Sequence, residues 1–274
     1  MITRKIIIVY KPTRECLEKA KKITTLCRDK GLEIELYSAD DIVYEKIVKP
    51  DIVIAIGGDG TLLKISRTYQ QYTPLILPIP CGRRTVLYEP IREEQYGEVI
   101  DRIINSTYRI QLLRRIKTSI RENEYLVLNE ILMVSIDRGR VTGFYIDIQN
   151  PIFTSSFSFD GDGVLIGPPI GSAAYNLSAR GPLIDYSLEA LFITPLNPME
   201  LNITPIIVNP LTKIKVKSRG YTEIYIDGER KEYIKPYTEV NIELSNKNLR
   251  IIRIYEKDYI RDVYFKRRMY YEPQ

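Results

Sequence analysis

The chain contains no histidine and no tryptophan, and only three of its 274 residues are cysteines. Without histidine, a Ser-His or Cys-His nucleophile and a histidine metal site are excluded, so acid–base chemistry must use carboxylates, lysines or tyrosines. Cys16, Cys27 and Cys81 are an odd number without a close pair. This pattern argues against a disulfide framework or a zinc site and favours a reducing compartment.

Long apolar segments are also missing. No run is long enough to span a bilayer, and residues 1–5 lead too quickly into charge and a strand pattern for a signal peptide. We therefore expect a cytoplasmic protein without membrane contact. The net charge of +5 is mild, and the basic residues are scattered among acidic ones, which favours an anionic small ligand over nucleic acid.

The hydrophobic periodicity divides the chain into an α/β part and a β part. Strands are predicted at 5–10, 32–37, 52–56 and 74–79, and helices at 13–30 and 93–105, so residues 1–105 should form an α/β domain with a parallel sheet. From 107 to 254 the period is mostly two, which predicts an all-β domain at 106–256. Residues 257–274 are predicted to form a C-terminal helix that packs back on the first domain.

The most informative motif follows the apolar run 52–56 and precedes a helical pattern. It consists of Gly57, Gly58, Asp59, Gly60 and Thr61. Glycines permit positive φ and let backbone N–H groups approach a ligand, and a helix N-terminus favours phosphate oxygens. Asp59 could hold Mg²⁺ or take a proton from an attacking hydroxyl. The alternative is a glycine-rich hairpin with Asp at a turn position, but the flanking strand and helix patterns favour the phosphate site.

Two arginines, Arg83 and Arg84, follow the strand predicted at 74–79. At the carboxyl end of a parallel strand they could pair with phosphates. A solvated loop explains the same position equally well.

Two polar residues interrupt an apolar pattern at 126–131. Asn129 and Glu130 are expected in the middle of a strand, where alternation turns one of them inward and burial demands a partner. A sugar hydroxyl and a base edge would satisfy both groups. A satisfied core asparagine is the simpler interpretation of this feature alone.

Small residues dominate the segment after Pro168 and Pro169. Gly171 and Ser172 are predicted to open a short helix that Gly181 ends, and Ser172 could cap it. Small side chains let a planar group approach the backbone closely. A capped short helix under a tight turn explains the ends of this segment but not its many small residues.

Taken together these motifs resemble the NAD kinase family. The Gly57–Thr61 sequence is similar to the GGDGT signature that NAD kinases share with diacylglycerol and sphingosine kinases. Asn129-Glu130 resembles the family's NE pair, and residues 162–182 are similar to its DG…PTGSTAYxLSAGGP segment. Residues 195–198 and 227–229 are similar to its PLxPH and DGQ turns, so the resemblance covers nearly the whole chain.

The resemblance implies an NAD kinase-like fold and phosphorylation of the adenosine-ribose 2′-hydroxyl of NAD to give NADP. It also implies ATP or polyphosphate as donor, a divalent metal such as Mg²⁺, and a homo-oligomer, a dimer or tetramer. Asp59 would be the catalytic carboxylate, and no metal ligand is assigned. Phosphates would be held by Gly57, Gly58, Gly60 and Thr61, and the dinucleotide by Asn129, Glu130, Asp162, Ala174, Tyr175 and Ser178.

The chain departs from the family pattern at several positions. Pro80 stands in place of an asparagine, Ala173 in place of a threonine, Arg180 in place of a glycine and Met199 in place of a histidine. The catalytic carboxylate and its turn are kept while substrate-side positions differ. A divergent NAD kinase fits best. A related kinase with a different acceptor, or a nucleotide-binding paralogue without catalysis, are the alternatives.

Overall fold

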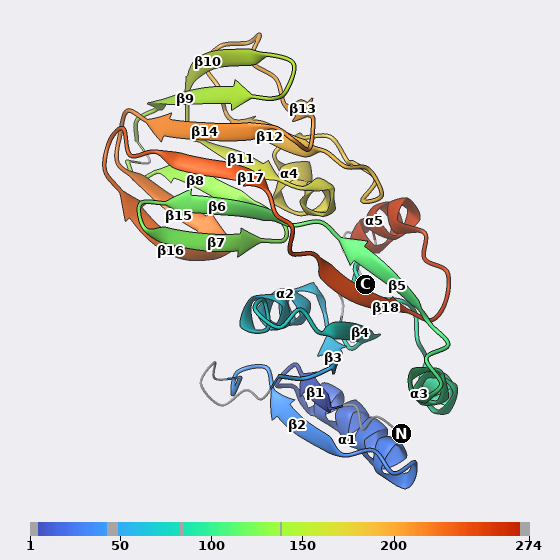
Figure 1. Cartoon of the computed structure of the whole chain (residues 1–274). Helices are drawn as coiled ribbons and strands as arrows, with labels where there is room; N and C mark the ends of the chain where they lie inside the picture. The colour runs from blue at the N-terminus through green and yellow to red at the C-terminus, as the bar shows by residue number, and fades with distance from the viewer. Residues whose placement is uncertain (1–4, 43–48, 83–84, 138, 269–274) are drawn as a thin grey trace. The chain divides into compact units, whose positions relative to one another are not determined.

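The computed structural model describes residues 5–42, 49–82, 85–137 and 139–268, without the side chains of 265–268. The chain forms two compact units (Figure 1). Unit 1 comprises Met1–Leu112 and Leu249–Gln274, and unit 2 comprises Leu113–Asn248. Unit 1 is α/β and unit 2 is built mainly from strands, so the predicted fold class is confirmed.

Unit 1 is built on a sheet with the order β2-β1-β3-β4-β18-β5. Its strands are β1 (Ile6–Tyr10), β2 (Ile34–Ser38), β3 (Ile52–Gly57), β4 (Leu75–Pro80), β5 (Arg109–Leu113) and β18 (Leu249–Arg253). The pairs β1–β2, β1–β3, β3–β4 and β4–β18 are parallel. Every residue of β3 is buried, which explains its continuous apolar sequence.

Helices cover this sheet. They are α1 (Arg14–Asp29), α2 (Asp59–Thr68), α3 (Tyr96–Ile104), preceded by the 3₁₀ turn η2 (Glu93–Gln95), and α5 (Tyr259–Arg268). The side chain of Thr13 accepts the Cys16 N–H and caps α1. The inner faces of α1 and α3 join the isoleucines of β1 and β3 in one core.

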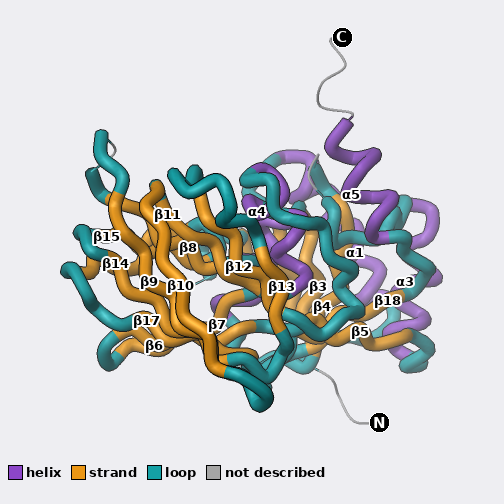
Figure 2. The backbone as a smooth tube through the Cα atoms, turned by 90° about the horizontal axis from the view of Figure 1, so that it is seen from above, coloured by secondary structure: helices purple, strands orange, loops and turns teal. Residues whose placement is uncertain are grey.

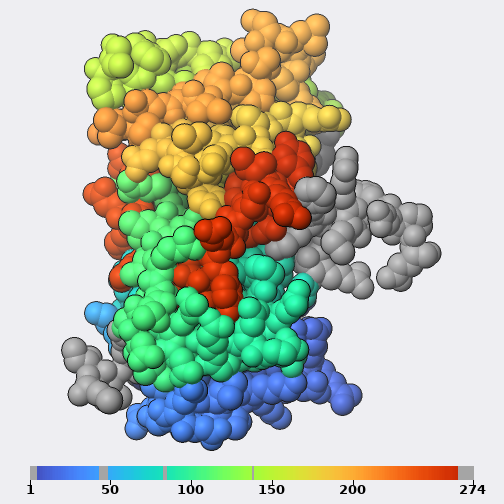
Figure 3. Space-filling model, turned by 90° about the vertical axis from the view of Figure 1, so that its right-hand side faces the viewer, coloured from blue at the N-terminus to red at the C-terminus, as the bar shows by residue number. Residues whose placement is uncertain are grey.

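The unit boundaries differ from the predicted domain boundaries at two places. Residues 106–112 and 249–256, which we expected in the second domain, contribute β5 and β18 to the sheet of unit 1. In the space-filling view the C-terminal segment of unit 1 lies against the green residues around β5 (Figure 3). Alternating apolar residues predict a strand but do not say which sheet it joins. The pairing of β18 with β4, in which Ile251 lies opposite Ile76, shows that β18 joins the sheet of unit 1.

A disulfide bond corrects the prediction made from the cysteines. Cys16 on α1 is bonded to Cys81, which follows β4, across a sequence separation of 65 residues. Cys27 is a buried free thiol. The pairing depends on how α1 packs against the sheet, so the spacing of cysteines along the chain did not indicate it.

Unit 2 contains two six-stranded sheets, ordered β10-β9-β14-β17-β6-β7 and β13-β12-β11-β8-β15-β16. Their strands are β6 (Ile116–Ile120), β7 (Asn123–Val127), β8 (Ile131–Ser135), β9 (Thr142–Gln149), β10 (Thr154–Gly161), β11 (Gly163–Gly167), β12 (Leu191–Leu196), β13 (Ile206–Val208), β14 (Lys213–Ser218), β15 (Thr222–Ile226), β16 (Glu229–Ile234) and β17 (Val240–Leu244). Inner-face residues of both sheets form one core, and Figure 2 shows the strands of this unit side by side.

Two irregular segments of unit 2 carry the sequence motifs. The chain passes from β7 in one sheet to β8 in the other through residues 128–130. After β11 it forms the 3₁₀ helix η3 (Pro169–Ala173) and the one-turn helix α4 (Tyr175–Ser178). Among the helices of the described ranges, none is long and apolar enough to cross a membrane.

Candidate functional site

In unit 1 the glycine motif forms the turn between β3 and α2. Gly58 is the N-cap of α2 in extended conformation, and Asp59 is the first residue of the helix. The Gly58 carbonyl oxygen accepts the Thr61 N–H at 2.9 Å and the Leu62 N–H at 3.1 Å. The motif joins a strand to a helix as predicted, but the strand extends to Gly57 and the helix begins at Asp59, inside the motif. The N-terminal helix dipole therefore points at this turn.

The Asp59 carboxylate is held by a second loop of unit 1. Its Oδ2 accepts the Val86 N–H at 3.1 Å, and its Oδ1 accepts the Leu87 N–H at 3.0 Å. Asp59 is half-buried. Two backbone donors, one on each oxygen, fix the plane of the carboxylate. Nothing in the local sequence pointed to Val86 or Leu87 as partners of Asp59.

Tyr88 belongs to the same loop and binds the same turn. It is fully buried, and its hydroxyl donates to the Gly58 carbonyl oxygen at 2.8 Å. Burial, followed by the negative charge of Asp59, raises the pKa of Tyr88 well above its ordinary value. Tyr88 therefore stays a neutral hydrogen-bond donor and cannot serve as a base near neutral pH.

The glycines of the motif act differently from the prediction. Gly58 has φ −129°, and the described glycines with positive φ are Gly31, Gly82 and Gly228. A Cβ on Gly57 would lie 2.7 Å from the Thr61 Cβ, so Gly57 is needed for packing. Gly60 is exposed and its missing Cβ would meet no atom within 4 Å. Of Gly57 and Gly60, the second leaves open backbone for a ligand to approach. Arg83 and Arg84 lie outside the described residues.

In unit 2 the Asn129-Glu130 pair lies in the link between the two sheets, and not in the middle of a strand as predicted. Asp227 accepts the Asn129 N–H at 2.6 Å and the Leu128 N–H at 3.1 Å, while its own N–H donates to the Glu130 carbonyl oxygen at 3.0 Å. Because these backbone groups bond to Asp227, they are withdrawn from strand pairing. Asp227 and Gly228 have φ values of 49° and 80°, as a two-residue hairpin turn requires.

Glu130 is the most strongly perturbed acid of this region. Its side chain is 7% exposed, and burial together with the nearby Asp227 charge raises its pKa to about 8. A backbone hydrogen bond from Tyr175 acts in the opposite direction. Within the described part of the chain, Oε2 of Glu130 is buried and has no hydrogen-bond partner. The structure therefore brings Glu130 together with the start of α4, and one carboxyl oxygen remains available to a ligand.

The small residues after β11 are explained in part by packing. A Cβ at Gly167 or at Gly171 would collide with the backbone carbonyl oxygen of Asn129. Ser172 does not cap a helix as predicted. Its buried hydroxyl accepts the Ile184 N–H at 2.9 Å and donates to the Ile184 carbonyl oxygen at 3.2 Å. The η3 segment thus lies directly on the Asn129 link.

Asn176 organises this loop and was not among the predicted site residues. The side chain is fully buried. It donates to the carbonyl oxygens of Ser172 and Pro182 and accepts the Thr194 hydroxyl at 2.6 Å. Its neighbour Tyr175 is 47% exposed, and Ser178 is also exposed. The signal available in the sequence was an amide residue between two predicted ligand residues, Tyr175 and Ser178.

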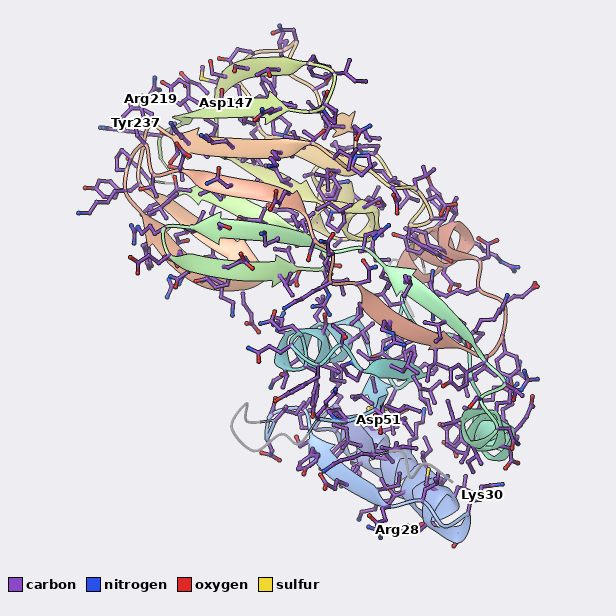
Figure 4. All side chains as sticks on the ribbon, viewed as in Figure 1. Arg28, Lys30, Asp51, Asp147, Arg219 and Tyr237 are labelled. Atoms are coloured by element: carbon purple, nitrogen blue, oxygen red, sulfur yellow. A yellow bond between two sulfur atoms is a disulfide. The ribbon has the colours of Figure 1, made fainter. Side chains whose placement is uncertain are left out.

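Asp162 is not brought together with the other predicted residues of unit 2. Its carbonyl oxygen accepts the Ser135 N–H at the end of β8, whereas Glu130 precedes that strand. The five residue-to-residue steps from Asp162 to Gly167 span about 17 Å along β11. Figure 4 shows Arg219, which pairs with Asp160, at the end of this unit that is remote from α4. Asn197 donates to the Asp162 carboxylate at 2.7 Å.

Comparison with known proteins agrees with this arrangement of motifs. Residues 6–108 match the family model of the ATP-NAD kinase N-terminal domain, and residues 128–254 match that of the C-terminal domain. An NAD kinase of Clostridium botulinum (strain Kyoto / Type A2) is 30% identical over 242 residues, covering 86% of this chain and 84% of the relative. An NAD kinase of Methanopyrus kandleri is 29% identical, covering 85% and 86%.

Solved structures show the same fold. A crystal structure of an NAD kinase from Archaeoglobus fulgidus in complex with ATP has a TM-score of 0.77 at 22% identity, covering 96% of this chain and 98% of that one. A yeast NADH kinase complexed with NADH has a TM-score of 0.84 at 17% identity, covering 100% and 89%.

The fold and the family matches define a phosphotransferase. The chain belongs to the NAD kinase family. The predicted family, enzyme class and reaction, phosphorylation of NAD to NADP, are confirmed at this level.

Proposed function

We propose that the chain transfers the terminal phosphoryl group of ATP to the 2′-hydroxyl of the adenosine ribose of NAD, with Asp59 as the base. The 2′-oxygen forms the new bond to phosphorus, the bond to the leaving ADP oxygen breaks, and the hydroxyl proton passes to the Asp59 carboxylate. The observation that carries this proposal is the fixed orientation of Asp59 at the N-terminus of α2, held by two backbone donors.

The donor phosphates would be bound by the turn at Gly57, Gly58, Gly60 and Thr61, with Arg83 and Arg84 as further candidates. Polyphosphate is the second candidate donor. In the described residues, no group of three His, Cys, Asp or Glu side chains could hold a metal ion. Mg²⁺ commonly binds through substrate phosphates and one or two carboxylates, so we propose that it arrives with the donor and that Asp59 is the nearest acidic ligand. The metal would neutralise charge on the transferring phosphates.

The dinucleotide would be bound by Asn129, Glu130, Ala174, Tyr175 and Ser178 of unit 2. The open Oε2 of Glu130 supports this assignment, because a buried oxygen without a protein partner can accept a hydroxyl of the ligand. Asp162 lies at the other end of β11 and would have to contact a different part of the ligand.

The direct test measures NADP⁺ formed from NAD⁺ by the purified protein with Mg²⁺ and either ATP or polyphosphate. Asp59→Asn should lower kcat by about 10²–10⁴-fold, and the variant should still fold, with a lower melting temperature because the amide keeps only one of the two backbone hydrogen bonds. A wild-type rate in Asp59→Asn would show that Asp59 is not the base. Wild-type protein that phosphorylates another alcohol but not NAD⁺ would support the different-acceptor alternative. Binding of NAD⁺ without turnover would support the non-catalytic paralogue.

Gly60→Ala tests the phosphate turn separately. Apart from its chain neighbours and the backbone of α2, the added methyl group would meet no atom of the described residues within 4 Å, so folding should be unaffected. It would stand where we expect a phosphate, so KM for the donor should rise while KM for NAD⁺ stays constant. Unchanged donor kinetics would show that the donor phosphates do not bind next to Gly60.

We also propose a homo-oligomer, a dimer or tetramer, in the cytoplasm. The Cys16–Cys81 disulfide means that the cysteines no longer support that location, because disulfides are rare in cytosolic proteins. Light scattering coupled to size exclusion gives the oligomeric state, and a monomeric mass for active enzyme would contradict the proposed homo-oligomer.

A further inference from the structure

The loop of residues 85–89 is bonded on both of its sides within unit 1. On one side Val86, Leu87 and Tyr88 bind the Asp59 turn. On the other side the same loop is bonded to the end of β18 and the residues that follow it. The C-terminal segment of unit 1 is therefore connected to Asp59 through a single loop.

Arg253, the last residue of β18, makes the first of these connections. It is 6% exposed, and its Nη1 donates to the Leu87 carbonyl oxygen at 2.9 Å. Its Nε donates to Oε1 of Gln111 at 2.7 Å, and the same nitrogen lies 3.9 Å from Oε1 of the buried Glu89. The guanidinium thus bonds a carbonyl and an amide while it offsets a buried carboxylate.

Two further contacts run parallel to the first. Lys257 Nζ donates to the Tyr88 carbonyl oxygen at 3.0 Å and also pairs with Asp262. Oε2 of Glu89 accepts the N–H groups of Ile254 at 3.0 Å and Tyr255 at 3.2 Å. Each of the three residues 87–89 is therefore bonded to the segment 253–257.

We propose that Arg253 is a positioning residue for Asp59 and acts through Leu87. The Leu87 carbonyl oxygen accepts from Arg253, and the N–H of the same residue donates to Asp59. The inference rests on the proposed role of Asp59 as base. A carboxylate that must meet a hydroxyl within hydrogen-bond distance is sensitive to small displacements of its support, and a shift of about 1 Å can cost about a hundredfold in rate.

Burial of Arg253 is difficult to explain by stability alone. A buried charge loses its hydration, and replacing a buried ion pair by apolar groups of similar size is often neutral or stabilising. An apolar side chain at this position, however, could not bond to Leu87.

The test compares Arg253→Met with Arg250→Met in the full-length enzyme. Arg250 lies on the same strand, is half-buried and donates to the Thr73 carbonyl oxygen at 3.5 Å, away from the loop. Arg253→Met should lower kcat by about 10- to 100-fold and leave KM for NAD⁺ and ATP within about twofold. Amide exchange of residues 85–89, followed by mass spectrometry, should accelerate. Arg250→Met should change neither kcat nor this exchange.

A second variant keeps the test valid if Arg253→Met does not fold, because that change leaves Glu89 buried without its cation. In Glu89→Gln/Arg253→Met the carboxylate charge is also removed, so folding should recover while kcat remains low. Arg253→Lys keeps the charge but cannot reach Leu87 and Gln111 together, and it should also fall short of wild-type kcat.

The outcomes separate the two proposals. Activity retained in Asp59→Asn would overturn the base role on which this inference depends. Loss of activity in Asp59→Asn, with wild-type kcat in the folded Arg253 variants, would overturn the positioning role alone. A change in KM without a change in kcat would also overturn it.

Discussion

Oδ1 of Asp227 accepts the backbone N–H of Asn129 at 2.6 Å, across 98 residues of sequence. The contact joins the turn of the β15–β16 hairpin to the link between β7 and β8. It withdraws Asn129 from strand pairing and places a second carboxyl group, that of Glu130, close to Asp227. One hairpin turn thus fixes the backbone of the proposed dinucleotide residues and adds to the effect of burial on the pKa of Glu130.

Asp227→Asn should therefore lower both the stability of the protein and its affinity for NAD⁺. The amide replaces charge-assisted hydrogen bonds by a weaker one, and we expect a loss of about 1.5–3 kcal/mol in the free energy of unfolding, measured with urea at pH 7. The affinity for NAD⁺, measured by calorimetry, should fall with it. Asp185→Asn, at an exposed turn where Oδ1 accepts the Ser187 N–H, is the control and should cost less than about 0.5 kcal/mol. Equal losses in both variants would contradict a special role for Asp227.

Glu130 should make stability depend on pH. Burial, followed by the Asp227 charge, raises its pKa from 4.5 to about 8, so the folded state binds a proton that the unfolded state has lost. Its contribution is fully present below pH 4.5 and disappears as the pH rises to about 8, a change of about 3–5 kcal/mol.

Urea unfolding of wild type and Glu130→Gln at pH 5, 7 and 9 measures this contribution. The difference in unfolding free energy between the two proteins should shift in favour of Glu130→Gln as the pH rises. Glu122→Gln, at an exposed position, should keep the wild-type pH dependence. Parallel curves for wild type and Glu130→Gln would show that Glu130 does not titrate in this range.

The Cys16–Cys81 disulfide should stabilise unit 1. Closing a loop over a separation of 65 residues is worth about 4 kcal/mol in the chain-entropy description. Cys16→Ser should lower the melting temperature under oxidising conditions and be insensitive to dithiothreitol, whereas wild type should lose stability when dithiothreitol is added. Cys27→Ser keeps the disulfide and should keep the response to reductant. Absence of that response in wild type would contradict the bond.

Arg180 has φ 64°, a conformation that side chains adopt at a cost. The resemblance to NAD kinases has glycine at this position, and the backbone explains why. Arg180→Gly should raise the free energy of unfolding by about 0.5–1 kcal/mol. Its neighbour Ala179 has φ −84°, so Ala179→Gly should lower it. A destabilised Arg180→Gly variant would show that the arginine side chain makes a contact worth more than the backbone strain.

Local sequence was sufficient for features that depend on near neighbours. The buried strand 52–56, the glycine turn and the start of α2 follow from an apolar run, a helical period and residues that suit a helix N-terminus. The hairpin turn at Asp227-Gly228 follows in the same way from the preference of this pair for positive φ. The types of neighbouring residues indicate whether a strand is buried on two faces and which backbone conformation a turn adopts. These features could therefore be predicted from the sequence.

The tertiary structure decided which distant residues meet. Asp59 with Leu87, Cys16 with Cys81 and Asn129 with Asp227 are separated by 28, 65 and 98 residues. Periodicity shows that a segment has a buried face but does not name its partner, so the disulfide, the sheet joined by β18 and the break at Asn129 were predicted incorrectly or not at all. The sequence by itself determined the composition of the site and the local shape of its turns, and packing of remote segments decided how those turns are held.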